Sequence, residues 1–160
     1  VIIKREIKMK IKYLLSFLLS IVFLSINSYA KSGKFDFHTG WSFNADVVKI
    51  SENHMIGSGK ALGATFNDKG EGFLHNGEGA CVVSFEVKDG KGENKGYCTW
   101  SDSDGDNIFT SFVGDTIQGT NTITGGTGKY TGISGSGPWV CKDFPNGASS
   151  CKQSLNYKLP

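Results

Sequence analysis

Hydrophobic and polar residues alternate along the segment 35–47. Every second position carries an apolar side chain with few exceptions, and most of the positions between them are polar. A period of two over this length predicts a β-strand with one buried face. The apolar set is Phe35, Phe37, Trp41, Phe43, Ala45 and Val47.

Seven further runs have the composition of β-strands, and no window shows a sustained helical period. Polar and glycine-rich turns separate the runs, for example Asn67-Asp68-Lys69-Gly70, Asp104-Gly105 and Gly125-Gly126. About eight short strands with such turns predict an all-β fold, either an antiparallel barrel or a sandwich. The seven runs are residues 55–66, 80–87, 96–100, 108–113, 115–124, 132–141 and 151–159.

The turns also indicate how the four cysteines pair. A two-residue hairpin turn at Asp89-Gly90 would place Cys81 opposite Cys98 at a position where side chains approach closely. Gly92 and Gly96 are unusual strand residues and leave a longer loop as an alternative.

The second cysteine pair flanks Pro145-Asn146-Gly147. Proline favours the first corner of a type I turn, and glycine suits the left-handed position of a three-residue hairpin loop, so Cys141 would face Cys151. Among the three pairings of four cysteines, we therefore predict two hairpin disulfides. Each would contribute about 3 kcal/mol by constraining the unfolded chain.

Residues 1–30 have the pattern of a secretory signal peptide, with residues 1–8 interpreted as an over-extended start. Lysines precede an apolar run over residues 13–26, and the small residues Ser28 and Ala30 stand where a signal peptidase would recognise them. That run would span roughly 21 Å as a helix, which is shorter than the ~30 Å hydrocarbon core of a bilayer. We expect cleavage after Ala30 and export to the periplasm or the extracellular space, where disulfides are stable.

The remaining 130 residues, 31–160, have the size of one domain, here a β-barrel domain. Residues 1–30 hold five of the 17 basic side chains and one of the 15 acidic ones, so the net charge changes from +2 for the whole chain to −2 for residues 31–160. A mildly acidic domain without a basic cluster argues against nucleic-acid binding, and we expect no membrane span in the mature chain. Nothing in the sequence marks an oligomer interface, and no oligomeric state is predicted.

The glycine-rich stretch 122–139 contains a Gly-Lys pair that could suggest a phosphate-binding loop. The P-loop motif fails at both anchor positions, because Ile123 replaces its first glycine and Tyr130 replaces its hydroxyl residue. A dinucleotide fingerprint fails as well, since Thr131 stands where glycine or alanine is required. We interpret the glycines as a tight connection between strands, with Tyr130 and Ile133 closing a barrel end.

This stretch resembles the G-G-[TS]-G-x-[FY]-x-G-x-x-G corner of the allene oxide cyclase and dirigent barrel group. The preceding segment 98–112 resembles the strand-turn-strand of bacterial members, and the resemblance covers residues 81–137. The corner residues are Gly125, Gly126, Gly128, Tyr130, Gly132 and Gly135.

The resemblance implies an eight-stranded antiparallel barrel with a central cavity, calycin-like in shape. In that group, plant cyclases bind an unsaturated fatty-acid epoxide, and dirigent proteins hold radical phenylpropanoids without oxidising them. No polar motif of this chain matches the cavity residues of those families, so no residue is assigned a catalytic role.

Two sets of side chains could suggest a metal site. The acidic turn at residues 102–106 lacks the glycine and glutamate spacing of an EF-hand calcium loop. The three histidines of residues 31–160 have no helical i, i+4 relation to one another. We interpret the turn as solvated and the histidines as exposed or singly hydrogen-bonded, and we expect neither a metal nor a cofactor. The sets are Asp102, Asp104 and Asp106, and His38, His54 and His75.

Three tryptophans, Trp41, Trp100 and Trp139, are candidates for lining a cavity, although core packing explains them as well. The leading hypothesis is a non-catalytic exported barrel that binds a small apolar or amphipathic ligand or interacts with envelope or extracellular components. A cyclase or isomerase that acts by conformational steering is the first alternative. A structural or inhibitory module with a filled barrel is the second. The first two require a cavity, and a polar group facing the lumen would favour steering.

Overall fold

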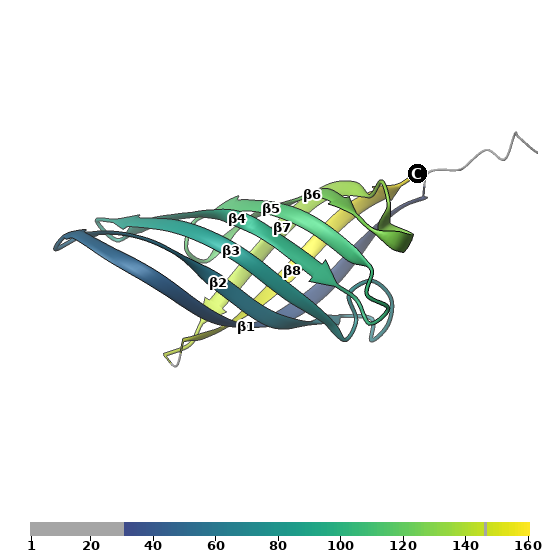
Figure 1. Ribbon diagram of the computed structural model, residues 1–160, viewed down its shortest axis with the longest axis horizontal. Helices are drawn as coiled ribbons and strands as arrows, with labels where there is room; N and C mark the ends of the chain where they lie inside the picture. Colours follow the sequence, from purple (N-terminus) through teal and green to yellow (C-terminus); the bar gives the residue numbers. More distant parts are fainter. Residues whose placement is uncertain (1–30, 146) are drawn as a thin grey trace, which may run out of the picture.

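A computed structural model of the protein describes residues 31–145 and 147–160; the expected signal peptide, residues 1–30, lies outside these residues. The chain forms a closed antiparallel barrel of eight strands in which each strand pairs with the next and β8 pairs with β1 (Figure 1). The predicted all-β barrel is therefore confirmed. The strands are β1 (Lys31–Ser51), β2 (His54–Asn67), β3 (Gly77–Lys88), β4 (Lys91–Ser101), β5 (Asn107–Gly114), β6 (Gln118–Gly126), β7 (Ser134–Asp143) and β8 (Ala148–Leu159).

The period of two in β1 has the predicted effect over the first half of the strand. Phe35, Phe37 and Trp41 are buried in the barrel, and Thr39 shares their face. The prediction that this buried face continues to Val47 is wrong, because Val47 is exposed. In Figure 1 the β1–β2 hairpin extends to one extreme of the barrel, and Val48 and Ile50 near its tip are exposed as well.

Both hairpin turns that carry cysteines have the predicted register. Asp89-Gly90 forms a two-residue turn between Lys88 and Lys91, which excludes the longer loop, and Cys81 pairs with Cys98. At the second turn, the backbone N–H of Phe144 donates to the carbonyl of Ala148, and Cys141 pairs with Cys151. The cysteines form the two predicted disulfides, and none remains free.

The turn expected at Gly125-Gly126 is wrong in its position. Both glycines belong to the end of β6 and pair with β5. The register between these strands shifts at Phe109 and Thr110, and this bulge takes up one extra residue of β6 before the strand ends. The chain then turns through a short 3-10 helix, η1 (Gly128–Tyr130), before β7 begins.

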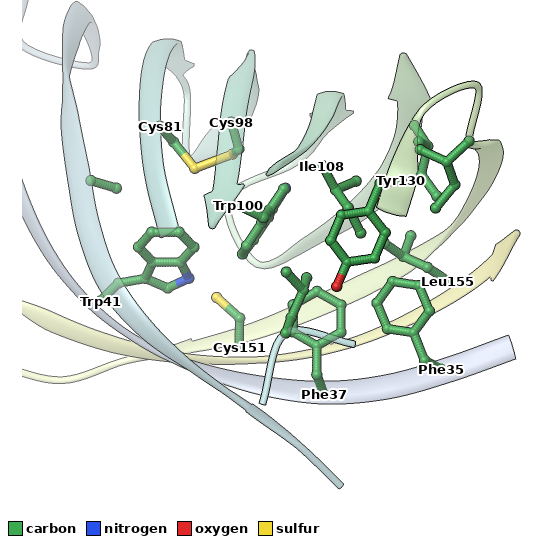
Figure 2. Packing of buried hydrophobic residues seen from close by; sticks show 14 residues of the cluster. Phe35, Phe37, Trp41, Cys81, Cys98, Trp100, Ile108, Tyr130, Cys151 and Leu155 are labelled. Atoms are coloured by element: carbon green, nitrogen blue, oxygen red, sulfur yellow. A yellow bond between two sulfur atoms is a disulfide. The ribbon is translucent and has the colours of Figure 1, made fainter. Parts of the chain in front are cut away.

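One end of the barrel is filled with side chains. Phe73 and Leu74, from the connection between β2 and β3, pack there with aromatic rings of β1 and with Tyr130 of η1. Tyr130 is fully buried and Ile133 nearly so, in agreement with their predicted place at a barrel end. Figure 2 shows Tyr130, Phe35, Phe37 and Leu155 converging in this part of the core. The filled end leaves the lumen near the opposite end as the place for a site.

Candidate binding cavity

The lumen contains a cavity of about 420 Å³ beside the hairpin turns β3–β4 and β7–β8. A volume of this size can hold one small organic molecule. Aromatic rings dominate its lining, and the remaining positions are mostly small or aliphatic. Six rings come from five strands, and a seventh comes from the turn between β7 and β8. The strand rings are Trp41, Phe43, Phe85, Trp100, Phe112 and Trp139, and the turn ring is Phe144.

All three tryptophans that the sequence suggested line this cavity. Trp100 lies between the cavity and the filled end (Figure 2). Its ring packs edge-on against Phe37, with the ring centroids 5.4 Å apart, and against Trp41, with the centroids 5.5 Å apart. The indole N–H of Trp100 donates to Thr110 Oγ1 at 2.8 Å, which satisfies its only polar atom. Trp100 is thus both a core residue and the floor of the cavity.

Both disulfides lie in the cavity wall. The cysteine side chains point inward, and all four residues contribute to the lining. Each disulfide joins neighbouring strands directly beside the lumen, so it restricts how far those strands can separate. The cysteines therefore support the shape of the cavity as well as the stability of two hairpins.

A buried chain of polar groups links β6, β8 and β1 on one side of the barrel. Asn121 Nδ2 donates to Gln153 Oε1 at 2.6 Å, and Gln153 Nε2 donates to Thr39 Oγ1 at 3.0 Å. Asn121 and Gln153 line the cavity. The sequence analysis missed them, although the period of two gives a signal: each lies two residues from a buried isoleucine or leucine, Ile123 or Leu155.

Charged groups are almost absent from the cavity lining. Among the described residues that line it, Asp143 alone carries an ionisable side chain outside a disulfide, and Asp143 is exposed at the rim. General acid–base chemistry would therefore have one carboxylate and no histidine to work with. The arrangement can hold an apolar molecule by shape and aromatic contact, with a few hydrogen bonds to orient it.

The Gly-Lys pair of the glycine corner does hold an anion, but the anion is a carboxylate of the same chain. The backbone N–H of Lys129 donates to Asp106 Oδ2 at 3.1 Å. Gly128 has a φ of 52°, and a Cβ at this position would lie 1.7 Å from Asp106 Oδ1. Only glycine allows the carboxylate to approach the backbone this closely. The remaining corner glycines lie in β6 (Gly125, Gly126), before β7 (Gly132) and in β7 (Gly135).

Asp102, which the sequence analysis placed in a solvated turn, is the centre of a buried cluster at the filled end. Its side chain is 4% exposed. Its Oδ2 accepts a hydrogen bond from the Tyr130 hydroxyl at 2.9 Å and forms an ion pair with Lys129 Nζ at 2.6 Å. Burial opposes ionisation of Asp102, but the hydrogen bonds from Lys129 and Tyr130 outweigh it, and its pKa is lowered from 3.8. Burial and the Asp102 carboxylate raise the pKa of Tyr130. The carboxylates of Asp102 and Asp104 raise the pKa of Lys129.

The three histidines do not come together. His38 Nδ1 lies 2.5 Å from Asp68 Oδ1, and His54 Nε2 lies 2.7 Å from Glu86 Oε1. His75 lies in the connection between β2 and β3. Within residues 31–145 and 147–160, no three histidine, cysteine or carboxylate side chains are placed to share a metal ion. The same part of the chain has no helix with the length and hydrophobicity to span a bilayer.

Comparison with known proteins supports the barrel fold. No protein-family model and no curated protein matches the sequence. Among solved structures, the pterocarpan synthase dirigent protein GePTS1 is similar at 11% identity and a TM-score of 0.54, over 82% of this chain and 86% of that one. The pterocarpan synthase dirigent protein PsPTS1 is similar at 15% identity and a TM-score of 0.50, over 81% and 95% of the two chains.

These likenesses show that the chain has the barrel fold of dirigent proteins. The glycine corner predicted a fold like that of dirigent proteins, and this prediction is confirmed for the fold. The allene oxide cyclase part of the resemblance stays a prediction.

Proposed function

We propose that the protein is an exported barrel that binds a small, largely apolar molecule in its lumen without changing it chemically. The observation that carries this proposal is the cavity itself, which measures about 420 Å³, is lined by seven aromatic rings and is closed at one end by the ring of Trp100. Burying an apolar ligand against such a wall is favourable by about 25 cal/mol per Å² of apolar surface. The cavity argues against a filled-barrel structural module.

Export is part of the proposal and is supported by the two disulfides. Disulfides persist in oxidising compartments such as the periplasm and the extracellular space. Both bridges lie in the wall of the lumen, so a stable cavity would depend on export to an oxidising compartment. Fractionation of cells that express the full chain, with N-terminal sequencing of the exported protein, tests cleavage after Ala30. Retention of residues 1–30 in the exported protein would refute it.

Conformational steering of a reactive lipid or phenolic substrate is the second candidate function. It is favoured by the amide groups of Asn121 and Gln153, which face the lumen and could orient a substrate. The single rim carboxylate, Asp143, leaves little acid–base capacity for a conventional mechanism. Steering would accelerate one outcome by restricting the conformation of the bound molecule.

The binding proposal is tested on the exported protein with naphthalene as the probe and isothermal titration calorimetry as the assay. Ala61 lines the cavity between Phe43 and Cys81, so Ala61→Leu extends three carbons into the lumen. We expect this variant to bind naphthalene at least about tenfold more weakly than the unmodified protein. The adjacent Leu62, which is exposed on the outer face, provides the control variant Leu62→Ala.

The control variant should bind naphthalene as the unmodified protein does. Absence of naphthalene binding, or equal binding by Ala61→Leu, would show that the lumen is not the site. Native mass spectrometry of the exported protein, followed by organic extraction, then identifies the class of any molecule that co-purifies.

A further inference from the structure

The side-chain charges of the barrel are divided between two sides of the molecule. Residues 31–44 and 134–160 carry five lysines and two aspartates, a net charge of +3. Residues 45–133 carry seven lysines and twelve acidic side chains, a net charge of −5. The two basic segments lie far apart in the sequence, which therefore shows no basic cluster. Closure of the barrel brings them together, because β8 pairs with both β7 and β1 (Figure 1).

Alternation along the strands places four of these five lysines on the outside of the barrel. Phe35 and Gln153, each next to one of the lysines in its strand, are buried, whereas the lysines themselves are exposed. We call the outward-facing side chains of residues 31–44 and 134–160 the basic face. Its lysines are Lys34, Lys142, Lys152 and Lys158.

The register groups these lysines in two pairs along β8. Lys34 is the diagonal neighbour of Lys158 across the β1–β8 ladder, and Lys142 is the diagonal neighbour of Lys152 across the β7–β8 ladder. Diagonal neighbours are about 7–8 Å apart, and the two lysines of β8 are separated by roughly 20 Å of strand. The basic face therefore offers positive charge over a length that exceeds one small anion.

Little of this positive charge is neutralised within the protein. Asp36 lies on the basic face and forms an ion pair with Lys34 at 3.2 Å. Asp68 lies nearby in the β2–β3 connection and bonds to His38. Among the described residues, no carboxylate lies within ion-pair distance of the other three lysines. An anionic partner would therefore meet lysines that are free to pair with it.

Neutral hydrogen-bonding groups occupy the positions between the lysines on β7 and β8. Hydroxyl and amide side chains both donate and accept, as the hydroxyl groups of a sugar do. The described side chains of the basic face include no Phe, Tyr or Trp on which a nucleic-acid base could stack, and residues 31–160 contain no arginine to form a bidentate contact with phosphate. These features favour a polymer of sugars that carry carboxylates. The neutral residues are Ser134, Ser136, Ser150, Ser154 and Asn156.

We propose that the basic face binds an anionic polysaccharide built from uronate sugars. The lysine ammonium groups pair with carboxylates of the polymer, and the serine and asparagine side chains between them bond to its hydroxyl groups. The lining of the lumen contains none of the outward-facing side chains of this face. The inference therefore goes beyond the proposed function, and the two sites are occupied independently. Binding retains the exported barrel at a surface that is coated with such a polymer.

The test measures binding of the exported protein to three immobilised polymers by biolayer interferometry. Alginate carries carboxylates and hydroxyl groups, dextran carries hydroxyl groups alone, and oligothymidylate carries phosphates without sugar hydroxyl groups along the chain. We expect alginate to bind at least about tenfold more tightly than either of the other two polymers. Raising NaCl from about 50 to about 300 mM should weaken alginate binding at least about fivefold, because salt screens exposed charges.

Two double variants assign the binding to the basic face. Lys152→Gln/Lys158→Gln removes two charges from it and should weaken alginate binding at least about fivefold. The control, Lys88→Gln/Lys91→Gln, removes two exposed lysines beside the β3–β4 turn and should change the affinity less than about twofold. Thermal unfolding checks that both variants are folded, and both should bind naphthalene as the unmodified protein does.

Several results would overturn the inference. These are absence of alginate binding, equal binding of alginate and dextran, oligothymidylate binding as tight as that of alginate, and equal effects of the two double variants. Light scattering without polymer provides a further test: self-association that Lys152→Gln/Lys158→Gln abolishes would assign the basic face to a second copy of the chain. Each of these results leaves naphthalene binding in the lumen, and with it the proposed function, to be judged separately.

Discussion

Replacing Asp102 with Asn should destabilise the barrel by about 2–3 kcal/mol at neutral pH. Oδ1 of Asp102 accepts from the backbone N–H groups of Asp104, at 2.9 Å, and Asp106, at 3.1 Å. An asparagine retains this oxygen. Its amide nitrogen replaces Oδ2, however, and cannot accept from Tyr130 or Lys129.

The magnitude follows from what these two lost partners contribute. A hydrogen bond to a charged group contributes about 1.5–3 kcal/mol, and the Tyr130 hydroxyl is deeply buried. The ion pair adds only about 0–1 kcal/mol because the Lys129 side chain is 42% exposed. Denaturant unfolding with intact disulfides measures the sum.

The pH dependence gives a second, independent readout. The folded-state pKa of Asp102 is lowered below its ordinary value of 3.8, so its stabilisation is present above about pH 3.8 and is lost as the pH falls through the folded-state value. Lys129 and Tyr130 have raised pKa values and stay protonated throughout this range. Asp36 and Asp115 also have lowered pKa values, but they are present in both proteins and cancel from the comparison. The stability difference between the unmodified protein and Asp102→Asn should therefore shrink below about pH 3.8.

Asp104→Asn is the matched control, because Asp104 contacts the same Lys129 ammonium but its side chain is 69% exposed. This variant should change the free energy of unfolding by less than about 1 kcal/mol. Equal effects of the two substitutions, or an Asp102→Asn effect that persists unchanged at the acid end, would refute the reasoning that a buried carboxylate locks the filled end.

Further predictions concern the disulfides and the cavity wall. Replacing Cys141 and Cys151 together with alanine should lower the free energy of unfolding by about 3 kcal/mol, as measured by urea unfolding, because the bridge closes a 10-residue separation; a loss below about 1 kcal/mol would contradict the chain-entropy argument. Gly114→Ala should destabilise the fold by about 1–3 kcal/mol, because the new methyl group would lie 2.2 Å from the carbonyl oxygen of Gln118 and 2.7 Å from the Trp139 ring. Thermal unfolding tests this prediction, and an unchanged midpoint would show that the wall is not closely packed there.

The sequence determined the strands and the cysteine pairing because both follow from local rules. Alternation of apolar and polar residues has the period of a strand, and tight turns fix which residues face each other across a hairpin. Asp89-Gly90 and Pro145-Asn146-Gly147 therefore favoured the cysteine pairing that the barrel has, while Gly92 and Gly96 left a longer first loop as an alternative. The glycine corner indicated the barrel group, since its close contacts tolerate few other residues.

Tertiary structure alone decided where the lumen is filled and where it is hollow. Alternation identifies the inward face of a strand but not the amount of space in front of it. The sequence therefore did not show that Trp100 forms the floor of the cavity, whereas Trp139 forms part of its side wall. The partnership of Asp102 with Tyr130 joins residues 28 positions apart, and Asn121 meets Gln153 across 32. Such contacts depend on the stagger of eight strands around a closed barrel, which no local pattern encodes. The same stagger placed Asn94 and Trp139 in one row of the barrel wall, separated by Gly114 and Gly119.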